Sequence, residues 1–98
     1  MYAHAQYIKI HKRIEVITTS KKVVRLRVNE LTRAQMDRNI STDSDLARII
    51  GVSVTQVWRA KLPPSDKRHN TPGVHFIAGV MTAFNAPFEK FFYLDEAN

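Results

Sequence analysis

A glycine between two short helical patterns constrains this chain more than any other feature. Leu46, Ile49 and Ile50 form an apolar stripe just before Gly51, and a second helical pattern begins after Ser53. Glycine adopts positive φ without steric cost, so Gly51 is expected to end the first helix in a tight turn. Short turns of this kind set two helices at about 90 to 120° to each other. We therefore expect a pair of crossing helices in the middle of the fold.

Both helices of the pair carry start signals. The Thr42 hydroxyl is placed to accept a hydrogen bond from the Asp45 amide, three residues later. Ser53 and Gln56 have the spacing of a full capping box, in which each side chain binds the backbone N–H of the other residue. These signals predict helix starts immediately after Thr42 and Ser53.

The second helix of the pair, residues 54–61, is expected to end before Pro63-Pro64. A small residue, Ala47, lies where the two helices cross, and Val57 and Ala60 face back into the core. Positions i, i+1, i+4 and i+5 cluster on one side of a helix. The side opposite the core therefore carries Val54, Thr55, Trp58 and Arg59.

Three more helices are predicted, over residues 29–38, residues 72–84 and a short stretch from residue 87 onward. Thr71 is the expected N-cap of the second of these, with Pro72 as its first residue. The residues expected to face the core are Val28, Leu31 and Ala34 in the first, Val74, Ile77, Met81 and Phe84 in the second, and Phe88, Phe91 and Phe92 in the third.

The N-terminal residues 1–27 differ from the rest, because apolar and polar residues alternate there and seven basic residues stand against one acid. Residues 8–16 and 24–28 alternate as β-strands do, and residues 18–22 fit a turn. We expect a basic β-hairpin extension over residues 1–27 and a helical domain over residues 28–98. The hairpin has three interpretations: a sheet shared across a dimer, a basic wing on phosphates, or a cover for the core.

The composition favours a polyanionic partner. The 98 residues include 15 Lys and Arg against 9 Asp and Glu, with a pI of about 10.0, which suits nucleic acid or an acidic membrane surface. The longest apolar run has nine residues, whereas a membrane-spanning helix needs about 20. With no cysteine there are no disulfides and no thiolate chemistry. We expect one domain that acts in the cytoplasm and does not span a membrane.

The sequence resembles the Cro/repressor-like, XRE-type family of helix-turn-helix regulators, also called lambda-repressor-like. The likeness covers about Val28 to Leu94 and rests on three segments. They are Leu46-Ala47-Arg48-Ile49-Ile50-Gly51-Val52-Ser53-Val54-Thr55-Gln56-Val57, Thr71-Pro72 through Phe84, and Pro87 to Leu94. The resemblance implies a mainly α, five-helix DNA-binding domain of a kind frequent in bacteria, phages and mobile elements. The hairpin and the long loop at Pro63-Pro64 lie outside the family pattern.

The resemblance also implies roles for individual residues. Val54, Thr55, Trp58 and Arg59 would face base edges, with Arg59 bidentate to a guanine and Val54 on a thymine methyl. Trp58 has a second interpretation, as a cover for an edge of the core. Helix N-termini and cations would bind phosphates. The residues expected to bind phosphates are Ser53, Gln56, Lys61, Lys67, Arg68, Thr71 and Gly73.

These inferences predict a transcriptional regulator, of repressor type, that binds double-stranded DNA as a homodimer. Its two recognition helices would lie about 34 Å apart in successive major grooves, and the hairpin is one candidate for the dimer contact. One alternative is a protein-interaction module, of antirepressor or inhibitor type, that uses Trp58 and the aromatic C-terminal residues. Another is single-strand binding by the hairpin, where only Tyr2 and Tyr7 are available for stacking.

No pattern supports catalysis. The four histidines lack i, i+4 pairing, and the acids at residues 43 and 45 suit the first turn of a helix. Nucleotide-binding glycine loops and nucleophile motifs do not occur. We therefore expect no enzyme, no cofactor, no metal and no small-molecule ligand.

Overall fold

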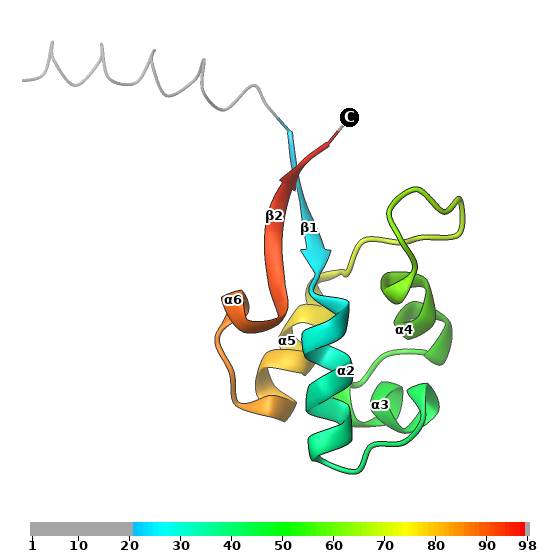
Figure 1. Ribbon diagram of the computed structural model, residues 1–98, viewed down its shortest axis with the longest axis vertical. Coiled ribbons are helices and arrows are strands. Elements are labelled where there is room, and N and C mark those ends of the chain that lie inside the picture. The colour runs from blue at the N-terminus through cyan, green and yellow to red at the C-terminus, as the bar shows by residue number, and fades with distance from the viewer. Residues whose placement is uncertain (1–20, 98) are drawn as a thin grey trace, which may run out of the picture.

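The computed structural model describes residues 21–97, and in that part the chain is mainly helical with a small two-stranded antiparallel sheet. Figure 1 shows the strand pair extending from one end of a bundle of helices, with the C-terminus at its far end. The elements, in chain order, are β1 (Lys22–Leu26), α2 (Val28–Asp37), α3 (Asp43–Ile50), α4 (Val54–Lys61), α5 (Val74–Phe84), α6 (Phe88–Phe91) and β2 (Phe92–Glu96).

The core is assembled from apolar residues of all five described helices and of both strands. Leu31 of α2, Leu46 of α3 and Val57 of α4 have no exposed surface. Phe76 from α5 meets Phe92 edge to face, with ring centroids 6.3 Å apart. The expected core positions in α2 and α4 are therefore confirmed, and the C-terminal phenylalanines belong to the same core.

The predicted start of α3 and its predicted end are both confirmed. The Thr42 hydroxyl accepts from the Asp45 amide at 3.0 Å. Gly51 has φ of 81°, and its amide and that of Val52 donate to the Ala47 carbonyl at 2.9 and 3.0 Å. These bonds satisfy donors and acceptors that a helix end otherwise leaves free.

The prediction that Ile49 lies on the buried side of α3 is wrong. Ile49 is 51% exposed, whereas Leu46, Ala47 and Ile50 are buried. The helix packs against α4 and α5, and Ala47 takes the buried position beside Leu46. Close approach to α5 depends on Gly79, because a Cβ there would lie 2.0 Å from the Ile50 carbonyl oxygen.

Helix α5 begins later than predicted and faces the core differently. Its N-cap is Gly73, without a side-chain cap, so Thr71 is not the cap and Pro72 precedes the helix. Of the predicted core residues, Phe84 is buried and Ile77 packs against the core, but Val74 is 79% exposed. Phe76 and Val80 are buried instead. Both stripes have helical spacing, and the larger aromatic surface decides which one is buried.

The sheet joins the two ends of the described chain. β1 pairs antiparallel with β2, in a register that runs from Lys22↔Glu96 to Leu26↔Phe92. The expected last helix therefore ends at Phe91, and Phe92 begins a strand, because it is buried opposite Leu26. A strand close to the predicted 24–28 is present, but Val28 belongs to α2. The other predicted strand of the hairpin, residues 8–16, lies outside the described residues.

Among the described helices, none combines the length and the apolar character that a membrane crossing requires.

Candidate functional site

The start of α4 is fixed by the predicted capping box. The Ser53 hydroxyl accepts from the Gln56 amide at 3.1 Å, and the Gln56 side-chain oxygen accepts from the Ser53 amide at 2.9 Å. Since both bonds form at once, the first turn of α4 is held at its exposed end. This end of the helix contains no acidic residue.

The two sides of α4 are arranged as the spacing predicts. Val57 and Ala60 are buried, with 0% and 2% of their surface exposed. Val54 and Thr55, at the opposite side, are exposed, and Val54 retains 41% of its surface although it is aliphatic. The N-terminal end of this face is therefore open to a partner.

Further along the same face, Trp58 and Arg59 are only half-buried. The Arg59 guanidinium lies 5.6 Å from the indole centroid, and that of Arg68, from the loop after α4, lies 5.7 Å from it. Cations attract the face of an aromatic ring, so these contacts hold the indole. The Arg59 Nε is buried and has no hydrogen-bond partner among residues 21–97.

The loop between α4 and α5 carries two of the predicted phosphate contacts. Lys67 is exposed, whereas Arg68 donates to the Asp66 carboxylate through Nε at 3.1 Å and Nη2 at 3.0 Å. The side chain of Arg68, followed by its backbone amide, lowers the pKa of Asp66 from 3.8 to about 2. Asp66 therefore stays ionised and offsets much of the charge of Arg68 at neutral pH.

A polar hollow of about 210 Å³ brings three further predicted residues together. Gln56, Thr71 and Gly73 line it, with Asn70, which sequence reasoning missed. Because α5 has no side-chain cap, the amides of its first turn are available to an outside acceptor. The hollow thus combines amide, hydroxyl and helix N-terminal donors beside the start of α4.

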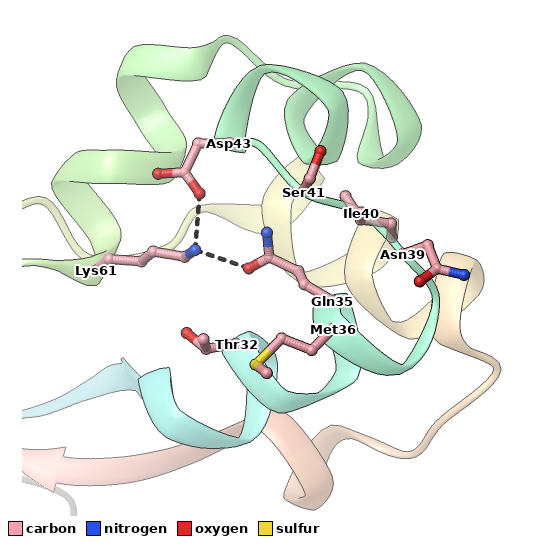
Figure 2. Close-up of a pocket in the computed structure, with 8 residues that line it drawn as sticks. All are labelled: Thr32, Gln35, Met36, Asn39, Ile40, Ser41, Asp43 and Lys61. Atoms are coloured by element: carbon pink, nitrogen blue, oxygen red, sulfur yellow. Dashed lines mark hydrogen bonds and ion pairs between the residues drawn. The ribbon is translucent and has the colours of Figure 1, made fainter.

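Lys61, in contrast, points away from that surface. Its ammonium donates to the Gln35 side-chain oxygen and to an Asp43 carboxylate oxygen, each at 2.7 Å (Figure 2). Only 18% of the Lys61 side chain is exposed. These two contacts therefore join α2, α3 and the end of α4. The ammonium that was expected to bind phosphate is paired with Asp43 instead.

Beside this ion pair lies a cavity of about 500 Å³ between α2, the α2–α3 loop and the end of α4. Met36 and Ile40 supply its apolar part. Of its polar groups, the side chains of Gln35 and Asp43 are already hydrogen-bonded to Lys61. The lining residues are Thr32, Gln35, Met36, Asn39, Ile40, Ser41, Asp43 and Lys61.

The sheet is tied to the loop after α4 by a polar chain. Arg25 of β1 contacts the Asp95 carboxylate of β2 and, through Nη1, His69 Nε2, each at 3.4 Å. His69 Nδ1 lies 2.8 Å from the Leu62 carbonyl oxygen. A guanidinium can only donate, so Nε2 accepts and the proton sits on Nδ1. Sequence reasoning missed this contact because no local signal links residues so far apart.

An apolar groove of about 440 Å³ lies between α3 and α5. Ile49 and the small residues Ala78 and Gly79 are among the residues that line it. None of its lining residues belongs to α4.

Comparisons of the chain with protein-family models, with curated proteins and with solved structures return no match.

Proposed function

We propose that this protein is a sequence-specific, double-stranded DNA-binding regulator of transcription in which α3, the turn at Gly51 and α4 form a helix-turn-helix. One observation carries the proposal. The exposed, acid-free start of α4 lies next to a polar hollow formed by Gln56, Asn70, Thr71 and Gly73. Groups able to contact base edges and groups able to bind phosphate therefore share one surface.

In the proposed complex α4 enters the major groove with its N-terminal end, so Val54 and Thr55 reach base edges first. Arg59 exchanges its position on Trp58 for a bidentate contact with a guanine, worth about 1 to 3 kcal/mol of discrimination. The buried, unpartnered Nε of Arg59 supports this step, since a donor without an acceptor makes its resting position costly.

Phosphate binding is assigned to the hollow and the loop. Gln56 keeps its side-chain NH₂ group for an outside acceptor, and Thr71 and the first amides of α5 add further donors. Lys67 contributes charge, and Arg68 contributes less because it is paired with Asp66. Lys61 takes no part in phosphate binding because its ammonium is paired with Asp43, and Ser53 acts by fixing the start of α4.

The proposed active form is a homodimer that occupies a near-palindromic operator, with half-sites one helical turn apart, and so represses transcription from DNA of the nucleoid. The strand pair offers a candidate contact between copies. Leu94 is 61% exposed on β2, directly opposite the half-buried Val24 of β1. A two-stranded sheet is marginal in water unless its apolar face is covered.

Selection of bound duplexes from a random pool, at physiological salt, tests the proposal. The expected result is one enriched motif with two-fold symmetry. Arg59→Ala should weaken that motif far more than random DNA, whereas Lys67→Ala should weaken both alike and reduce the salt dependence. Equal losses on both DNAs for Arg59→Ala, or no enriched motif, would overturn sequence-specific recognition.

The groove between α3 and α5 favours a second candidate, a module that binds another protein. Ile49, which lines it, is exposed, and so is Val74, the chain neighbour of the lining residue His75; exposed aliphatic residues of this kind are found in protein interfaces. This function predicts DNA binding that is weak, nonspecific and lost at physiological salt, so the same selection separates the two.

A further inference from the structure

Two of the four residues predicted to face outward from α4, Val54 and Trp58, are apolar, which narrows the kind of base edge that this face fits. Val54 projects at the start of the helix, and Trp58 follows one turn later on the same side. The guanidinium of Arg68, 5.7 Å from the indole centroid, limits the movement of the ring even when Arg59 leaves the indole for a guanine. A held ring loses little freedom on binding, so it suits a contact that depends on fit.

Few side chains at the exposed start of α4 could recognise a base by hydrogen bonding. Gln56 has the amide that would pair with adenine through both its oxygen and its nitrogen. Its oxygen, however, already accepts from the Ser53 amide at 2.9 Å. Thr55 offers one hydroxyl and one methyl group. Of the four residues predicted to face base edges, only Arg59 carries a charge.

In the major groove, the C5-methyl group of thymine is the one apolar feature that a base pair presents. We infer that α4 recognises 5-methylpyrimidines: Val54 and the edge of Trp58 enclose thymine methyl groups beside the guanine bound by Arg59. This inference rests on the DNA-binding function proposed above and names the class of sequence that it reads. Because the contact is with the methyl group, 5-methylcytosine should replace thymine at the same positions.

The test uses the duplex motif enriched by selection. Each thymine is replaced in turn by deoxyuridine, which removes only the methyl group, and the dissociation constant is measured at physiological salt. At the contacted positions we expect a loss of about fourfold in affinity, as for one buried methyl group. Replacing the same T·A pair by 5-methylcytosine·G should restore more binding than replacing it by C·G.

Two matched valine variants show whether the effect comes from α4. Val54→Ala should reduce the thymine-to-uracil ratio at one position, since it withdraws the surface that touches the methyl group. Val74→Ala makes the same change at the start of α5, at a valine that is 79% exposed against 41% for Val54, and should leave that ratio unchanged.

The outcomes separate this inference from the function on which it rests. Equal affinity for thymine and uracil at every position, in a duplex that still binds specifically, overturns methyl recognition and leaves the regulator function standing. A uracil effect that Val54→Ala does not alter also overturns it, because DNA deformability then explains the loss. Failure to bind any duplex overturns both.

Discussion

Gly79→Ala is expected to destabilise the protein even though alanine is the better helix former. A Cβ at this position would lie 2.0 Å from the Ile50 carbonyl oxygen and 2.9 Å from the Ile50 carbonyl carbon. These are backbone atoms, so no side-chain rotation removes the clash, and α5 must move away from the end of α3. Overpacking of this kind costs about 1 to 3 kcal/mol, and the geometry places Gly79→Ala at the upper end.

The helix propensity of alanine offsets about 1 kcal/mol of that cost. We therefore expect a net loss of about 2 kcal/mol in the free energy of unfolding. Urea unfolding followed by circular dichroism measures this loss, with an unchanged m-value showing that the two end states are the same. The transition temperature should fall by about 4 to 8 °C for each kcal/mol lost.

The neighbouring substitution Ala78→Gly is the control, because residue 78 is exposed on the same helix. It should cost about 1 kcal/mol through propensity alone. If Gly79→Ala instead stabilises the protein by about the amount that Ala78→Gly destabilises it, α3 and α5 do not meet as closely as described.

Three further changes test single contacts. Ser53→Ala removes one bond of the capping box and should lower the free energy of unfolding by about 1 kcal/mol in thermal denaturation; an unchanged stability would contradict the role of the cap. Lys61→Met keeps the apolar stem but leaves Asp43 without its cation, so we expect a loss of about 1 kcal/mol in the free energy of unfolding. The salt dependence of duplex binding should not change. If the slope of log affinity against log salt concentration falls by about 0.9, Lys61 contacts a phosphate and the ion pair is not its role. The pKa of the Asp66 carboxyl should be about 2 in an NMR titration, and its stabilising contact with Arg68 is complete above pH 3.8 and lost as the pH falls through about 2. Arg68→Ala should return this pKa toward 3.8. A pKa near 3.8 in the unaltered protein would contradict the pairing.

Features fixed by nearby residues could be predicted from the sequence. The caps at Thr42 and Ser53 and the turn at Gly51 each depend on groups within four residues. Their chemistry is complete in a short segment, so a pattern of residue types is enough to locate them. The buried side of α4 follows in the same way from the spacing of Val57 and Ala60.

Features that depend on distant contacts could not be predicted. The pairing of β1 with β2 joins residues about 70 positions apart. Phe92, the first residue of β2, continues the helical spacing of Phe88 and Phe91 equally well. Lys61 has the sequence context of an exposed cation, but the fold places Gln35 and Asp43 within its reach. Which of several acceptors a long side chain finds is a property of tertiary packing.

The face of α4 lies between these cases. Helical spacing correctly places Val54 and Thr55 outward, but it cannot show that the loop after α4 partly covers Trp58 and Arg59. The contacts responsible come from Arg68 and from the Asn70 amide, which donates to the Arg59 carbonyl at 3.3 Å.

The most direct test of the proposed DNA-binding surface is an NMR titration of the full chain with a duplex from the selected pool, at physiological salt. Shifts of the backbone amides should concentrate at residues 53–59 and 70–73, the start of α4 and the border of the polar hollow. Shifts centred on β2 and α6, or on the groove between α3 and α5, or no shifts at saturating duplex, would contradict the account.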